Sequence, residues 1–444
     1  MTRPLKVFTC CALAFLFVVA FLPLRLEGDS LRFFAMALPA ATGGAYSRDQ
    51  FPPFYPHLLC ALMKAGWCNG VVLIFINIVS LLAPLIICRK ILKLIGASPT
   101  ETLFSLWAIP LSWCMAKHTM LPLSDILHLP FFLGTPLCIM LADRAFAPSR
   151  RIAWLTLAAL SAMTAISIRT AALPLLGVIA IAATGIQNGK IRSHLRSRTF
   201  WSVILAIAAA LLVATVLVFR YTAFNAEGSY FMSFKAFASK GSIFDFAKVI
   251  HMHLTEFAQL AVNLPASRLP HCVMKMCAII SPILLTAAVL RWFRWLDWPL
   301  ILTGLGYTLE ILVWPYTDPR FLLPLVPLCA LLAVHCLSDI YRHYRLWRPL
   351  IISYGAVFFF FGVTSWGWLA WQGCLGDDFY KHTTRQLLAR DYRNARTKHL
   401  DEIPSSERTL ALFILKKFDP MHTLGEDEQL DLGDYVKYTG RSFD

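Results

Sequence analysis

The chain has 444 residues, of which 57% are hydrophobic and only 15% are charged, and its mean hydropathy is +0.60. Soluble domains carry charge on roughly a quarter of their residues, so this composition excludes an ordinary water-soluble fold and predicts an integral membrane protein. The formal net charge of +15 does not indicate a nucleic-acid partner, because no DNA- or RNA-binding module is visible and basic residues between apolar runs typically face membrane lipids.

Apolar runs recur along the chain, and several approach the ~20 residues that a helix needs to cross hydrocarbon. A barrel would show short alternating segments instead, so the sequence predicts an all-α polytopic membrane protein with about eleven spans. The first, 7–24, is preceded by Arg3 and Lys6 like a signal peptide, but no small-residue cleavage site follows, so we expect a retained anchor. The other predicted spans are 70–88, 101–115, 126–142, 152–168, 171–187, 201–219, 272–290, 298–314, 321–338 and 349–370.

Basic residues collect in alternate short loops, which predicts that these loops face the cytoplasm. They are Arg89, Lys90, Lys93, Arg144, Arg150, Arg151, Lys190, Arg192, Arg196, Arg198, Arg291, Arg294, Arg342, Arg345 and Arg348. The intervening connections, around 117–125, Arg169 and 318–320, carry far fewer. The amino terminus is therefore expected inside, and an odd number of spans places the carboxyl terminus outside.

This topology divides the chain into a transmembrane domain, 1–370, and an external tail or small cap, 371–444. Two long external segments interrupt the transmembrane domain, at 25–69 and 220–271. The first contains an aromatic, amphipathic stretch at 50–59 that suits a helix lying at the membrane interface.

Ionisable residues in or beside a membrane are costly, which makes them candidates for function. Six of them are expected at the external face: Glu27, Asp29, Asp125, Arg169, Asp318 and Arg320. An acid there could activate an acceptor, and an arginine could hold a lipid-linked phosphate with two hydrogen bonds. Each could instead be an interfacial residue that merely neighbours water. Because their loops emerge on one side, we expect Asp29, Asp125, Arg169 and Arg320 to share a cavity.

Two further polar features leave alternatives open. Glu310, inside an apolar run, is expected either to make a buried structural hydrogen bond or to line a donor channel. His118 and His128 flank Asp125 and could join the site or form hydrogen bonds at the interface.

Five short motifs follow one another along about 1–330: Gly28-Asp29-Ser30-Leu31-Arg32-Phe33-Phe34, Pro-Pro-Phe-Tyr-Pro at 52–56, Leu123-Ser124-Asp125, Ile168-Arg169-Thr170-Ala171-Ala172 and Asp318-Pro319-Arg320-Phe321-Leu322-Leu323-Pro324. In this order and on this side of the membrane, they resemble the GT-C fold membrane glycosyltransferases. That superfamily includes protein O-mannosyltransferases, the lipid A aminoarabinose transferase and oligosaccharyltransferase catalytic subunits. The chain departs from many relatives in the glycine between Glu27 and Asp29, and in an aspartate at 125 where glutamate is frequent.

The resemblance implies a GT-C-like helix arrangement and inverting transfer of a sugar from a polyprenyl-phosphate donor to a lipid, glycan or protein acceptor. The reaction would take place at the external, periplasmic face of a bacterial inner membrane. No cofactor is implied with certainty, and a divalent metal ion is possible. The implied roles are catalysis by Asp29, Glu27 and Asp125, with Asp29 as the base; phosphate binding by Arg169 and Arg320; and support from Asp318, His128 and Tyr55.

Two other classes of function compete with the enzyme. A transporter or flippase for a lipid-linked saccharide would also need charged residues near one face, but it should show charges at the membrane midplane and broken helices in matched halves. A non-catalytic membrane scaffold would keep the fold and lose the acids, whereas Asp29 and Asp125 are present.

The topology is tested by labelling introduced cysteines with a membrane-impermeant reagent in intact cells. Positions in 225–265 and 380–440 should react from outside, because the alternation of basic loops and the odd number of predicted spans place both segments on the external side. Positions in 190–198 should not react. Labelling of that basic loop from outside would reverse the predicted side of every candidate residue.

Overall fold

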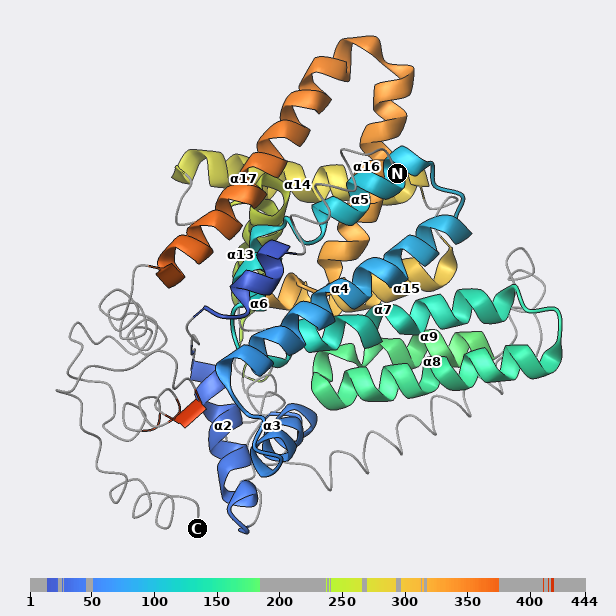
Figure 1. Ribbon diagram of the computed structural model, residues 1–444. Helices are drawn as coiled ribbons and strands as arrows, with labels where there is room; N and C mark the ends of the chain where they lie inside the picture. Colours follow the sequence, from blue (N-terminus) through green and yellow to red (C-terminus); the bar gives the residue numbers. More distant parts are fainter. Residues whose placement is uncertain are drawn as a thin grey trace.

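The computed structural model describes residues 14–22, 26, 28–44, 51–183, 237, 239, 241–265, 270–292, 297–312, 314, 318–374, 410, 414, 417 and 418. Every element within these residues is a helix (Figure 1). Five are long and apolar enough to cross a membrane, namely α4 (Gly70–Leu94), α7 (Ser124–Asp143), α8 (Pro148–Ile168), α16 (Leu325–His343) and α17 (Arg348–Cys374). Shorter apolar helices are α9 (Pro174–Ala183) and α15 (Trp298–Leu312), and α14 (His271–Trp292) contains a short apolar stretch at Cys272–Ser281.

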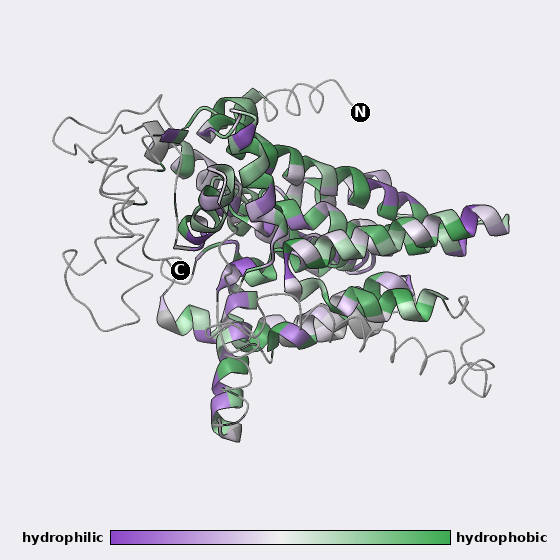
Figure 2. Ribbon diagram, turned by 90° about the horizontal axis from the view of Figure 1, so that it is seen from below, coloured by the Kyte–Doolittle hydropathy of each residue, from purple (hydrophilic) through white to green (hydrophobic). Residues whose placement is uncertain are grey.

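Hydrophobic residues run along most of each long helix, including surfaces that face outward (Figure 2). Ile86 of α4 is 73% exposed and Phe360 of α17 is 65% exposed. Such surfaces are costly in water and favourable in hydrocarbon. The chain is thus an integral membrane protein. The count of eleven spans stays a prediction, because 201–219 and half of 7–24 lie outside the described residues.

One predicted span, 101–115, is wrong as a single helix. The structure divides it into α5 (Pro99–Ala108) and α6 (Trp113–Thr119), joined by the turn at 109–112. Pro110 explains the break, because proline has no backbone N–H to donate and its ring clashes with the preceding helical turn. Hydropathy averaged over the run does not register a single proline, so the composition predicted one helix.

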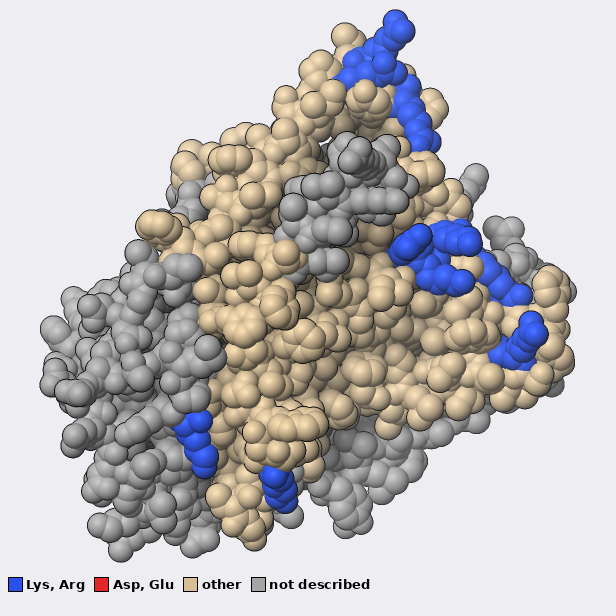
Figure 3. Space-filling view, in the orientation of Figure 1, with Lys and Arg blue, Asp and Glu red and all other residues tan. Residues whose placement is uncertain are grey.

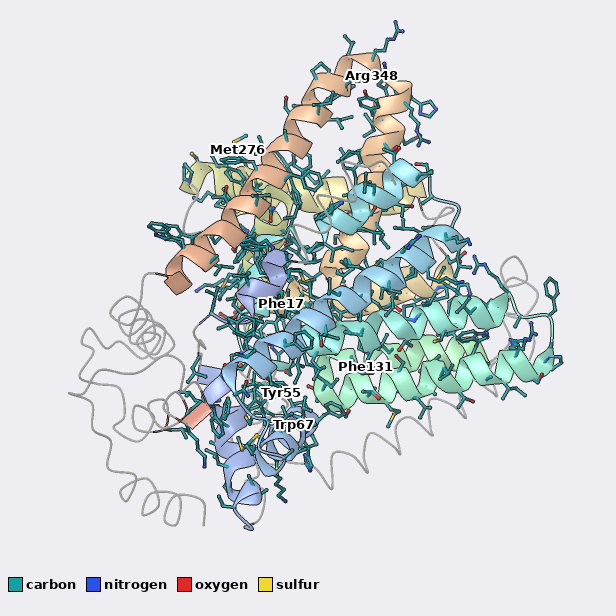
Figure 4. All side chains as sticks on the ribbon, in the orientation of Figure 1. Phe17, Tyr55, Trp67, Phe131, Met276 and Arg348 are labelled. Atoms are coloured by element: carbon teal, nitrogen blue, oxygen red, sulfur yellow. The ribbon has the colours of Figure 1, made fainter. Side chains whose placement is uncertain are left out.

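The segment predicted to be the first external one contains two helices, α2 (Gly28–Ala41) and α3 (Phe54–Lys64), which pack against each other. Tyr55 of α3 is almost completely buried in the core between them (Figure 4). Two tail positions, Ile414 and Phe418, are buried in the same core, and the ring centroid of Phe418 lies 5.4 Å from that of Phe34. This part of the tail therefore covers α2.

The side chain of Asn263 joins three parts of the fold. Asn263 caps the carboxyl end of α13 (Ile243–Val262), and its backbone has the left-handed conformation with φ 61°. Its amide nitrogen donates to the carbonyl oxygens of Leu111, at 2.9 Å, and Phe358, at 2.8 Å. Its amide oxygen accepts from the backbone nitrogen of Trp113 at 2.7 Å. One buried side chain thus satisfies backbone groups in the 109–112 turn, α6 and α17.

The helix ends form two chemically different groups. Arg144, after α7, bonds Asp297 at 2.6 Å and the carbonyl oxygen of Leu94 at 3.4 Å, and Arg342 bonds Ser98 at 3.2 Å. These contacts gather the predicted cytoplasmic loops at one end, where Lys and Arg are prominent (Figure 3). The opposite ends of α7, α8 and α16 carry the candidate acids and arginines.

The crossing of α17 over the 109–112 turn generates a test of the packing. A Cβ atom on Gly362 would collide with the carbonyl oxygen of Leu111, whereas a Cβ on Gly355 of the same helix would meet nothing within 4 Å. We expect Gly362→Ala to lower the free energy of unfolding by about 1–3 kcal/mol, because overpacking forces the helix away from the turn. The thermal unfolding midpoint in detergent should fall accordingly. Gly355→Ala should be neutral or slightly stabilising. Equal stability of the two variants would contradict the close approach.

Candidate functional site

A cavity opens at the helix ends opposite the basic loops, with about 640 Å3 of empty space including its mouth. Its charged lining comes from five separate segments of the chain. Asp29, Asp125, Arg169 and Arg320 all line it, so the expected shared cavity is present. Aromatic side chains make up much of the remaining wall: Phe33, Phe51, Tyr307, Trp314 and Phe321.

Asp125 and Arg169 form a buried ion pair across the cavity wall. Asp125 lies in the first turn of α7, where the helix dipole favours an acid. Arg169 follows the last turn of α8 in an extended conformation, with φ −147° and ψ 124°. The two side chains are 3% and 13% exposed, so each charge is largely withdrawn from water and depends on the other.

Arg320 contacts two acids. It forms an ion pair with Asp29, in the first turn of α2, and its Nε lies 3.4 Å from Oδ2 of Asp318. Asp318 also accepts a hydrogen bond from the backbone nitrogen of Arg320 at 2.9 Å and so begins the short helix η4 (Pro319–Leu322). Burial alone would raise the pKa of Asp318, but Arg320 and Lys117 lower this pKa to about 2. Asp318 is therefore an anion at neutral pH.

The ring of Phe321 lies close to the guanidinium groups of both Arg169 and Arg320. The guanidinium carbon of Arg169 lies 5.4 Å from its centroid, and that of Arg320 lies 5.3 Å away, both within cation–π range. The Tyr307 hydroxyl donates to the carbonyl oxygen of Phe321 at 2.9 Å, which ties η4 to α15. The two positive groups are thus held beside one aromatic surface.

A buried pair in α13 supports another part of the wall. His253 Nδ1 lies 2.9 Å from Glu256, and its Nε2 lies 2.9 Å from the carbonyl oxygen of Trp314. Burial raises the pKa of Glu256, while the hydrogen bond from His253 lowers it, and the net shift is upward. Because Trp314 lines the cavity, α13 takes part in fixing its shape although the sequence indicated only a long external segment.

The other predicted residues occupy different places. Asp318 adjoins the cavity through Arg320 but is not part of its lining. Tyr55 lies 5.0 Å, centroid to centroid, from the lining residue Phe33, and His128 packs against Phe132 in the interior of the bundle. Glu27 lies outside the described residues. The roles assigned to all of these residues stay predictions.

Glu310 is the acid whose place the sequence left open between two alternatives. It projects from α15 into the cavity lining, and its Oε2 is buried without a hydrogen-bond partner. The structure therefore places it in the cavity and does not supply the expected structural hydrogen bond at that oxygen. Among the described residues, no group of three or more His, Cys, Asp or Glu side chains could hold a metal ion.

No protein-family model matches this chain, and no curated protein matches it in sequence. Two structures of ArnT from Cupriavidus metallidurans are similar to it, each 16% identical over 94% of this chain and 70% of that chain. Their TM-scores are 0.48 for the apo state and 0.47 for the complex with undecaprenyl phosphate. The Archaeoglobus fulgidus oligosaccharyltransferase, in complex with Zn and sulfate, is 12% identical over 80% of this chain and 52% of that chain, with a TM-score of 0.45.

Replacing one member of the buried ion pair tests its energetic role. We expect Arg169→Met to destabilise the protein by about 3–5 kcal/mol, because it leaves the Asp125 charge buried and unpaired. The double variant Asp125→Leu with Arg169→Met should regain most of that stability, since two apolar side chains of similar volume remove both charges. Thermal unfolding in detergent measures both effects. A single variant as stable as the parent would show that the pair is solvated.

Proposed function

We propose that this chain is a membrane glycosyltransferase, which moves a sugar from a polyprenyl-phosphate donor to a lipid, glycan or protein acceptor at the external face. The main support is the meeting of Arg169 and Arg320 with Asp29 and Asp125 in one cavity at the helix ends opposite the basic loops. Phosphate is the group that paired arginines recognise best, because the planar guanidinium donates two parallel hydrogen bonds.

The membrane setting favours a lipid-linked donor. The outward surfaces of the long helices are apolar, so a polyprenyl chain can approach the cavity from within the bilayer. The phosphate of such a donor is already the leaving group. Recognition of a nucleotide is then unnecessary, and the protein has to bind a phosphate, a sugar and an acceptor hydroxyl or amide.

The ion pairs suggest how donor binding prepares the base. A donor phosphate that binds Arg320 competes with Asp29 for the same guanidinium. Once displaced, the Asp29 carboxylate can take the proton of the acceptor as the acceptor oxygen or nitrogen attacks C1 of the sugar. The bond between C1 and the phosphate oxygen breaks with its electron pair on the phosphate, and the configuration at C1 inverts. Arg320 and Arg169 stabilise the charge that develops on the leaving phosphate, by several kcal/mol at most.

The reaction is tested with Asp29→Asn, which keeps the shape of the side chain and removes the base. Sugar transfer from a polyprenyl-phosphate donor should fall roughly 10²- to 10⁴-fold, the usual contribution of a positioned acid or base. Donor binding should not weaken, because the charge removed competes with the phosphate.

Asp318→Asn is the matched control, because it also removes an acid from Arg320 but lies outside the cavity lining, and asparagine still begins a helix well. It should cost far less than Asp29→Asn. Glu27→Gln should also cost little, whereas Arg320→Ala should weaken donor binding. If Glu27→Gln abolishes transfer and Asp29→Asn does not, the base is Glu27. If neither Asp29→Asn nor Glu27→Gln lowers transfer, neither acid is the base and the proposed reaction is contradicted.

A further inference from the structure

Glu310 is the carboxyl group of the cavity that the transfer step leaves without a task. It lies in α15, an apolar helix, and its Oε2 is buried with no hydrogen-bond partner. Leaving a buried polar oxygen without a hydrogen bond lowers the stability of the protein, and the penalty is larger for a charged group than for a neutral one. A ligand bound in the cavity can supply the missing hydrogen bond.

The helix directs Glu310 toward the ligand space. Tyr307, Glu310 and Ile311 are spaced by three and four residues, so they share one face of α15, and all three line the cavity. The hydroxyl of Tyr307 already donates to Phe321, so it is engaged with the backbone. Trp314 follows α15 and also lines the cavity, and the backbone carbonyl oxygen of Trp314 contacts Nε2 of His253. Glu310 therefore presents a polar group beside apolar and aromatic walls.

The balance of charge decides which part of the donor meets Glu310. Arg169 is paired with Asp125, and Arg320 with Asp29. A donor phosphate adds negative charge beside these arginines, so an additional anionic ligand group at Glu310 would be repelled. The part of a polyprenyl-phosphate sugar that is neutral and rich in hydrogen-bond donors is the sugar ring with its hydroxyl groups. A carboxyl oxygen accepts from such a hydroxyl.

We propose that Glu310 binds one hydroxyl group of the transferred sugar and thereby selects among donors that differ at that carbon. This inference rests on the proposed glycosyltransferase function and deepens it. It makes Glu310 a specificity-determining residue, distinct from the base. A donor that lacks the hydroxyl, or carries it in the opposite configuration, leaves Oε2 unpaired in the complex and is disfavoured.

The test uses the full-length protein in nanodiscs and short-chain polyprenyl-phosphate monosaccharides as donors, comprising hexoses epimeric at C2, C3 and C4 and their single-deoxy analogues. The wild type should prefer donors with one particular hydroxyl. Glu310→Leu should lose transfer of those donors by roughly 5- to 100-fold, the factor for removing a hydrogen bond to a buried polar group, and should no longer discriminate against the deoxy analogue. Glu310→Gln should retain the preference, because its amide still accepts from a hydroxyl.

A folding control is Thr308→Leu, a polar-to-leucine change in the same helix outside the cavity lining. It should leave the donor preference unchanged. An unchanged preference in Glu310→Leu would overturn the inference while leaving the transferase intact, provided that Asp29→Asn still abolishes transfer. Loss of the preference in Glu310→Gln as large as in Glu310→Leu would also overturn it, because charge rather than hydrogen bonding would then select the donor. Absence of transfer by the wild type from every donor would contradict the proposed function itself.

Discussion

The buried ion pair between Asp125 and Arg169 is the constraint on which the cavity depends. Neither charge is stable alone in the interior, so the start of α7 and the end of α8 must stay together. The contact of Arg320 with Asp29 joins η4 to α2 in the same way. Phe321 packs beside both guanidinium groups. The ion pairs therefore hold the site together, and in the proposed function an anionic donor enters it by exchange with an acid of the protein.

Much of the helical framework follows from hydropathy alone. The structure places α7 at Ser124–Asp143 and α8 at Pro148–Ile168, close to the predicted spans 126–142 and 152–168. The hydrocarbon core holds no water to form hydrogen bonds with backbone N–H and C=O groups, so long apolar runs form helices, which satisfy these groups internally. The turn at 109–112 was missed because it depends on one proline. The packing of α13 was missed because it depends on side chains such as Asn263, whose partners are 95 and 152 residues away.

The candidate site was predictable where topology alone brings residues together. Alternating loops put Asp29, Asp125, Arg169 and Arg320 at one end, and the structure brings all four to one cavity. The direction of a side chain around its helix is not given by topology. Glu310 could therefore not be assigned to the cavity in advance, although its isolation in an apolar run marked it as unusual. The position of Phe321 directly after Arg320 in the sequence also indicated that its ring could lie near the site.

The junction at Asn263 constrains the order in which the protein assembles. The carbonyl oxygen of Leu111 and the backbone nitrogen of Trp113 are synthesised well before residue 263, and the carbonyl oxygen of Phe358 follows much later. Lipid offers these groups no substitute partner. Until α13 is synthesised, these groups therefore lack the partner that Asn263 supplies, and the junction is complete only when α17 has been added. The packing of the 109–112 turn, in the early part of the chain, is thus completed by α17.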